Sequence, residues 1–141
     1  MLHAQKINCK KYGFSLIELL IVLALLGIFL CIVYPNYTQH LVAVRRTNVA
    51  AVLLDLAARM EQFYISNNSY LGAKLAQLGT DDSSYQKYYQ LSIKSTADTY
   101  LLSAMPLAVQ AAADQVCGTL SLDEQGNKTI SGSGVLEDCW P

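Results

Sequence analysis

The stretch FSLIELLIV, residues 14–22, places one carboxylate, that of Glu18, near the start of a long apolar segment. A charged side chain at membrane depth costs roughly 3 kcal/mol on insertion scales, so such a residue usually has a partner and a function. Glu18 is therefore the first candidate functional residue. The alternative is a plain membrane anchor that carries a single glutamate near the interface.

The apolar segment is long enough for a membrane span. Leu19 to Val44 are 26 residues without Asp, Glu, Lys or Arg, and at about 1.5 Å per residue they exceed the roughly 30 Å of hydrocarbon in a bilayer. A secretory signal would have a shorter apolar core followed by a small-residue cleavage site. Three lysines lie before the span and two arginines after it. The numbers of basic residues on the two sides are too similar to orient the span by the positive-inside rule, so charge alone leaves the topology open.

The residues KYGFSLIEL, 11–19, resemble the class III signal of type IV prepilins. In that family a membrane peptidase cuts on the cytoplasmic side after the glycine and N-methylates the new terminal phenylalanine. The resemblance implies cleavage between Gly13 and Phe14, methylation of Phe14 and a cytoplasmic N-terminus. It also implies that Glu18, then the fifth residue, meets the terminal amine of a neighbouring subunit, where opposite charges attract more strongly than in water.

The resemblance divides the chain into a prepilin leader at 1–13, a transmembrane and assembly helix at 14–37, and a soluble head at 38–141 that includes the second half of the long helix. Loss of the leader, which is longer than the six or seven residues common in type IVa pilins, leaves seven Lys and Arg against eleven Asp and Glu, a net charge of about −4. The implied partners are other pilin subunits through the helix, the prepilin peptidase and the inner-membrane assembly platform. We expect a single-pass inner-membrane protein with a periplasm-facing head, which reaches the cell surface in the pilus.

Helical periodicity continues beyond the apolar segment. Apolar residues recur there at alternating spacings of three and four, which is typical of one helix face, and Asp55 and Arg59 form a favourable i, i+4 pair. The pattern ends at residues 66–69, SNNS, which favour helix ends and turns. We therefore expect one helix from Phe14 to about Ser66. Its apolar stripe consists of Val42, Val49, Leu53, Leu56, Met60 and Phe63.

Two helix-weakening residues lie within this predicted helix. Pro35 removes a backbone hydrogen bond and favours a kink or local opening, and Gly27 is a second weak point. Type IV pilins carry a glycine and a proline at these positions, and by resemblance residues 27–35 could become extended in an assembled fibre. An ordinary proline kink is the alternative.

The second half of the chain changes to strand periodicity. Residues 89–94 alternate apolar and polar side chains, residues 99–105 form a second run, and the runs at 118–122 and 128–130 flank a Gly-containing turn. We expect three or four antiparallel strands that form a sheet with one apolar face. That face must be buried against another element, and the apolar stripe of the helix can cover it. The sequence thus predicts an α+β fold, with a long N-terminal helix packed on a small antiparallel sheet, which is the pilin architecture.

Two of the four cysteines, Cys117 and Cys139, lie in the part of the chain that the proposed topology places in an oxidising compartment. We expect them to form a disulfide, which resembles the C-terminal disulfide of type IV pilins; two free thiols are the alternative. Together with the ending Asp138-Cys139-Trp140, residues 117–120 resemble the PilE-type minor pilins of gammaproteobacteria.

The residues do not support an enzyme, a cofactor or a metal site. After removal of the leader only His40 remains as histidine, so no catalytic triad or histidine-rich metal site can form. The acidic pairs at 81–82, 123–124 and 137–138 could bind calcium, as loops do in some secretion pseudopilins. We interpret them as solvated turn residues, because no alternating ladder of Asp and Asn ligands is present.

Tyrosines outside the span, together with nearby lysines, raise the question of DNA binding. Stacking and phosphate contacts could involve Lys74, Lys87 and Lys94. The negative net charge argues against direct nucleic-acid binding, and such tyrosines more often bury their rings in a sheet.

The predicted function is that of a structural minor pilin, inserted into a type IV pilus or priming it. The assembled pilus would act in adhesion, twitching motility and DNA uptake. The alternatives are a receptor pilin that binds DNA or a surface, and a type II secretion pseudopilin, for which calcium dependence would be diagnostic.

Overall fold

The computed structural model describes residues 13–79 and 83–140. It divides into two compact units, Met1–Tyr37 and Thr38–Pro141, which are described separately. Helix α1 (Leu16–Asn67) contributes residues to both units. The predicted helix at 14–66 is confirmed, with its first turn beginning two residues later than expected.

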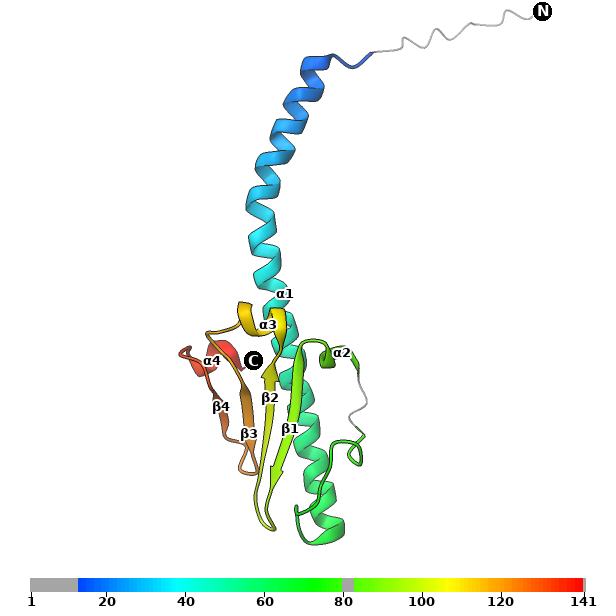
Figure 1. Cartoon of the computed structure of the whole chain (residues 1–141), viewed down its shortest axis with the longest axis vertical. Helices are drawn as coiled ribbons and strands as arrows, with labels where there is room; N and C mark the ends of the chain where they lie inside the picture. Colours follow the sequence, from blue (N-terminus) through cyan, green and yellow to red (C-terminus); the bar gives the residue numbers. More distant parts are fainter. Residues whose placement is uncertain (1–12, 80–82, 141) are drawn as a thin grey trace, which may run out of the picture. The chain divides into compact units, whose positions relative to one another are not determined.

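The second unit contains a four-stranded antiparallel sheet in the order β1-β2-β3-β4, formed by neighbouring strands in sequence (Figure 1). The strands are β1 (Tyr89–Ser95), β2 (Tyr100–Pro106), β3 (Leu120–Asp123) and β4 (Lys128–Ile130). The register pairs Leu102 of β2 with Ile93 of β1 and with Leu122 of β3. The predicted α+β fold is therefore confirmed.

The core of this unit lies between the sheet and the second half of α1, which crosses one face of the strands (Figure 1). Alternating residues of β1 and β2 are buried, as their period of two requires. The predicted helix stripe from Val49 onward faces the same core, although Phe63 is only partly buried. Val42 is buried but is not part of this core cluster. The most deeply buried residues of the two faces are Val49, Ala50, Leu53, Leu56 and Met60 on α1 and Tyr89, Leu102, Ala104, Leu120 and Leu122 on the sheet.

The end of α1 is set by Asn68, which follows the last helical residue with a φ of 52°. Asparagine tolerates this left-handed conformation better than most residues, and it is a common way to end a helix. Its backbone N–H donates to the carbonyl of Tyr64 at 2.7 Å. Within α1, Arg59 Nη1 donates to the carbonyl of Leu78 at 2.6 Å. This hydrogen bond connects the segment before β1 to α1.

Three short helices were not predicted: α2 (Ser83–Gln86), α3 (Ala108–Ala113) and α4 (Leu136–Cys139). Each has four to six residues, which is too short for a helical period to be recognised in a sequence. Helix α2 precedes β1, α3 lies between β2 and β3, and α4 follows β4. Helix α3 contains Gln110 and is followed by Asp114, two of the polar residues described below.

Candidate assembly site

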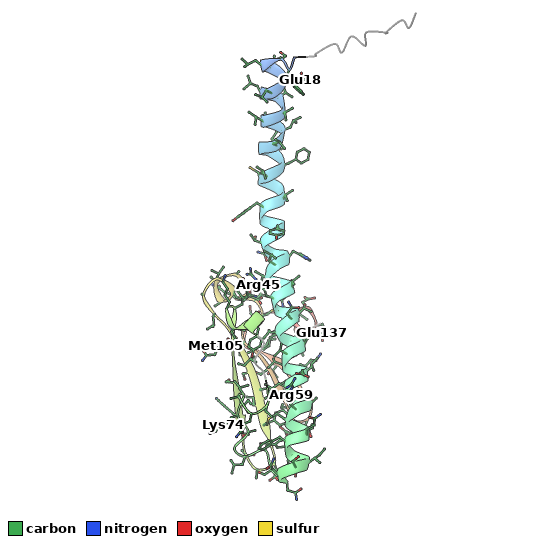
Figure 2. All side chains as sticks on the ribbon, turned by 90° about the vertical axis from the view of Figure 1, so that its right-hand side faces the viewer. Glu18, Arg45, Arg59, Lys74, Met105 and Glu137 are labelled. Atoms are coloured by element: carbon green, nitrogen blue, oxygen red, sulfur yellow. A yellow bond between two sulfur atoms is a disulfide. The ribbon has the colours of Figure 1, made fainter. Side chains whose placement is uncertain are left out.

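The start of α1 carries the residues that the sequence singled out. Gly13, Phe14 and Ser15 precede the helix without regular structure, and Glu18 lies in its first turn (Figure 2). A carboxylate there is favoured by the partial positive charge of a helix N-terminus. A Cβ added at Gly13 would meet no heavy atom within 4 Å, so nothing in the described fold requires glycine at that position.

The described part of the first unit, which begins at residue 13, is mainly apolar and exposed. The side chain of Phe14 is 83% exposed, and large apolar residues on every face of the following turns are also exposed. A helix that is apolar all round needs cover from lipid or from other helices. No helix within the described residues is both long enough and apolar enough to cross a membrane. The exposed set includes Leu16, Ile17, Leu19, Leu20, Ile21, Leu23, Leu26, Ile28, Phe29 and Leu30.

Helix α1 is continuous through Gly27 and Pro35. A Cβ at Gly27 would also meet nothing within 4 Å, so its role is not one of close packing within the chain. The extended conformation predicted for residues 27–35 concerns the assembled fibre, and it stays a prediction.

The structure joins Cys117 and Cys139 in a disulfide, as predicted, with their Cα atoms 5.5 Å apart. Both residues are buried. The bond connects the segment between α3 and β3 to α4, so it fixes the end of the chain against the sheet. Among the described residues Cys31 is a free cysteine, and it is exposed.

A buried polar cluster, which the sequence did not indicate, lies where α3 contacts α1. Asp114, 3% exposed, accepts from Arg46 Nη1 at 2.6 Å and from the hydroxyl of Tyr89 at 3.3 Å. Gln110 Nε2 donates to the hydroxyl of Tyr89 at 2.9 Å and to the carbonyl of Val42 at 3.2 Å. These contacts tie α1, α3 and β1 together.

Two features of this polar cluster bear on its energetics. Burial and the neighbouring charge of Asp114 raise the pKa of the Tyr89 hydroxyl well above its usual value. Gln110 Oε1 is buried without a hydrogen-bond partner. The sequence contained one signal for the cluster: Gln110 and Asp114 are four residues apart and would share a helix face, but α3 itself was not predicted.

A second polar group lies near the end of α1, where two tyrosines donate to one carboxylate. The hydroxyl of Tyr70 lies 3.0 Å from both oxygens of Glu61, and the hydroxyl of Tyr100 lies 3.2 Å from Oε1. Burial, and secondarily the hydrogen bond to Glu61, raise the pKa of Tyr70 to about 12. Burial and Glu61 also raise the pKa of Tyr100. These tyrosine rings are buried, as was expected for tyrosines of the sheet.

The residues considered for DNA binding are dispersed. The guanidinium carbon of Arg45 lies 3.9 Å from the ring centroid of Tyr88, and Lys87 Nζ lies 5.7 Å from it. Figure 2 places Arg45 and Lys74 toward opposite ends of the second unit. Of the three lysines considered, Lys87 is thus beside an aromatic ring, together with an arginine that the sequence had not singled out for this role. Elsewhere in the described residues, Lys128 Nζ lies 5.1 Å from the ring centroid of Trp140.

The acidic turn at 123–127 is closed by hydrogen bonds within the chain. Asp123 accepts from the backbone N–H groups of Gln125 and Asn127 and from the Asn127 side chain, and the Asn127 hydrogen bonds lower its pKa. Within residues 13–79 and 83–140, no group of three or more His, Cys, Asp or Glu is arranged to hold a metal ion. The pair at 81–82 lies outside the described residues.

Two family models match the chain. Residues 35–121 match the model described as "Type IV minor pilin ComP, DNA uptake sequence receptor", and residues 8–34 match the prokaryotic N-terminal methylation motif. Together the two matches cover the predicted cleavage site, α1 and the sheet as far as β3.

Individual relatives agree with these matches. The chain is 33% identical over 94 residues to the major component PilA4 of the type IV wide pilus of Thermus thermophilus, covering 65% of this chain and 71% of that protein. A type IV pilin structure from Shewanella oneidensis is similar with a TM-score of 0.54 and 28% identity, covering 71% of this chain and 98% of the other. The non-core minor pilin PilV of Neisseria meningitidis, with a TM-score of 0.53 and 24% identity over 67% of this chain and 90% of the other, shares the fold.

Proposed function

The chain belongs to the family of type IV minor pilins, and from this we propose that it is cut after Gly13, N-methylated at Phe14, and then inserted into a type IV pilus or used to prime one. The observation that carries the proposal is the start of α1. There a single carboxylate, in the first turn of α1, is followed by a run of exposed apolar side chains. Such a surface is suited to assembly with other helices.

Processing is supported by the local structure at the cleavage point. Residues 13–15 lie outside the helix, so a peptidase would not have to unwind α1 to reach the bond. Phe14 is highly exposed. Cleavage creates an amine four residues before Glu18, and methylation keeps that amine cationic. In a helix bundle of low dielectric constant, this charge would attract the Glu18 carboxylate of a neighbouring subunit.

Before assembly, we propose that the first unit anchors the chain in the inner membrane in a single pass, with the prepilin peptidase and the assembly platform as partners. The proposal of a membrane pass rests on the sequence, because Leu19 to Val44 contain no charged residue. The head would face the periplasm, where a disulfide between Cys117 and Cys139 is stable. Protease accessibility in intact spheroplasts tests this topology, since only the head should be degraded.

The experiment that tests the pilin function is mass spectrometry of the native chain in fibres sheared from cells. We expect a mature N-terminus at methylated Phe14 and co-purification with the fibre. A chain that keeps residues 1–13, or that is absent from fibres, would contradict the proposal. Calcium-dependent folding of the head would instead favour a secretion pseudopilin.

A second candidate function is DNA reception, which the description of the matched family favours. Arg45 and Lys87 flank the ring of Tyr88, and aromatic rings beside cations can stack bases and contact phosphate. Replacement of Arg45 and Lys87 by Ala should weaken DNA retention by the purified chain and flatten its salt dependence. Lys74→Ala with Lys94→Ala is the matched control, and equal retention in both double variants would exclude a site at Tyr88.

A further inference from the structure

Strand β1 forms one of the two edges of the sheet. Each of its residues pairs with one residue of β2, without a bulge. Hydrogen bonds just beyond its two ends fix which of its backbone groups face β2: Leu107 N–H donates to the Tyr88 carbonyl at 2.8 Å, and Thr96 N–H donates to the Thr99 carbonyl at 2.9 Å. Because these groups alternate along an antiparallel pair, the even-numbered residues of β1 face β2 and the odd-numbered residues face away from it.

The outward-facing backbone groups of β1 therefore belong to Tyr89, Leu91, Ile93 and Ser95. Within the part of the chain that the structure describes, no other segment hydrogen-bonds to the backbone of these residues. The opposite edge is better protected, because β4 has only three residues and the indole of Trp140 donates to its backbone at 3.1 Å. Short edge strands and covering segments prevent pairing with another chain. With seven residues, β1 is the edge that can accept a further strand.

A pocket of about 310 Å³ borders this edge, between β1 and the segment that precedes α2 (Figure 1). Three consecutive residues of β1, 89–91, line it. Consecutive side chains of a strand point to opposite faces of the sheet, so a pocket that reaches all three lies at the edge of the strand. The outward-facing backbone groups of residues 89 and 91 are on that edge. We call it the edge pocket, and its apolar lining consists of Leu75, Ala76, Tyr85, Tyr89, Leu91 and Leu107.

The described lining of the edge pocket is uncharged. Gln86 and Gln90 complete it. Lys94, the single charged residue of β1, is exposed and does not line the pocket, and the acidic pair at 81–82 lies outside the described residues. The described lining thus offers apolar surface and amide groups, and no partner for a charge.

We propose that the edge pocket binds an extended segment of a partner protein, which adds to β1 as a further strand and inserts an apolar side chain beside Leu75 and Leu91. Donors and acceptors that recur at every second residue match an extended backbone, whose own groups have the same period. In such strand addition, main-chain hydrogen bonds supply affinity, and pockets for alternate side chains supply specificity. The site belongs to the head, so it acts independently of the insertion of α1 into a pilus.

The test measures binding of a fluorescent peptide to the full chain in lipid nanodiscs, by fluorescence anisotropy. The peptide is Thr-Val-Thr-Phe-Thr-Val-Thr with capped ends, so that its apolar side chains share one face of a strand. Two doubly N-methylated forms lack N–H groups either at the third and fifth residues or at the fourth and sixth. Because the N–H groups of neighbouring residues face opposite edges of a strand, only one form loses its hydrogen bonds to β1.

We expect that form to bind about tenfold more weakly than the unmodified peptide, and the other form to bind equally well. Equal affinities of the two forms, or no binding of the unmodified peptide, would overturn the inference. N-Acetylphenylalaninamide supplies the apolar side chain without a strand, so equal affinity for this compound would also overturn it, by showing that the pocket takes a small apolar ligand.

A second measurement fills the edge pocket. Ala76→Trp places an indole there from an exposed position, where folding should tolerate it. Ala112→Trp on α3 is the matched control, because Ala112 is also exposed and does not line the pocket. We expect Ala76→Trp to weaken binding of the unmodified peptide by about tenfold and the control to leave it unchanged, with equal thermal unfolding. Equal affinities of the two variants would contradict the inference, and the N-methylated peptides test it on the unmodified chain if a variant fails to fold.

Discussion

Arg46 on α1 and Asp114 after α3 are 68 residues apart in sequence, and their side chains meet at 2.6 Å within the head. The pair is largely removed from solvent, with exposed fractions of 17% and 3%. The Asp114 carboxylate also accepts from Tyr89 and Gln110. A buried ion pair is not in itself a large source of stability, but removal of one partner leaves an uncompensated charge.

Asp114→Asn should therefore destabilise the chain by about 3 kcal/mol, the lower end of the range for broken buried pairs because Arg46 retains some contact with water. The measurement is denaturant unfolding of the mature chain, followed by a signal from the head. Asp55→Asn is the matched control, because it breaks the exposed pair with Arg59 and should cost less than about 0.5 kcal/mol. Equal losses in the two variants would contradict this interpretation of the polar cluster.

Alkaline pH should destabilise the head through its buried tyrosines. The pKa of Tyr70 is raised to about 12, and those of Tyr89 and Tyr100 are raised as well. Because the unfolded chain ionises first, near pH 10, the stability contributed by the neutral hydroxyls is present below that pH and is lost as the pH rises through the folded pKa. The free energy of unfolding should thus decline between pH 10 and 12.

The matched variant for this pH dependence is Tyr70→Phe, which removes one of the shifted hydroxyls. We expect a shallower decline of stability above pH 10 than in the unmodified chain. Tyr37→Phe, at an exposed position, should leave the decline unchanged. A curve that is insensitive to Tyr70→Phe would show that this hydroxyl does not govern the alkaline transition.

Glu18→Gln should leave cleavage after Gly13 intact and reduce the amount of the chain in fibres by about tenfold, because the neutral amide cannot pair with a cationic amine. Quantitative immunoblotting of sheared fibres and membranes measures both quantities. Glu18→Asp keeps the charge on a shorter side chain and should retain part of the incorporation. Normal incorporation of Glu18→Gln would exclude the pairing mechanism.

Loss of the disulfide should destabilise the head. The bond closes a loop between residues 22 apart, which corresponds to roughly 3 kcal/mol on the chain-entropy model. We expect the Cys117→Ala, Cys139→Ala double variant to unfold at lower denaturant concentration by about that free energy. Cys31→Ala lies outside the head and should leave its unfolding unchanged; similar losses in both would argue against a structural role for the bond.

Strong periodicity made most of the fold predictable. The stripe from Val49 to Met60 and the alternation in β1 each repeat over enough residues to give a helix and a strand their bounds within a few positions. The signal around Gly13 and Glu18 was local and specific, so the candidate residues of the assembly site followed directly from it. Three or four strands were expected from the same kind of periodicity, and the disulfide was expected because the proposed topology places Cys117 and Cys139 in an oxidising compartment.

The polar cluster was not predictable, because it depends on contacts between residues distant in sequence. Arg46 lies outside the apolar stripe of α1, and nothing in a linear pattern indicates that Asp114 lies opposite it. The short helices α3 and α4 that position Asp114 and Cys139 contain too few residues to show a period. Tertiary packing, and not local preference, determines these elements.

The carbonyl of Val42 accepts from Gln110, and Val42 is the first buried residue along the described part of α1. Turns of the helix before this point make no contribution to the hydrophobic core of the head. A tensile load that unwinds residues 27–35 would therefore lengthen the subunit without dismantling its folded domain. If residues 27–35 extend in the fibre as predicted, the segment that lengthens is separate in sequence from the residues of the core, and a stretched fibre could shorten again with every head folded.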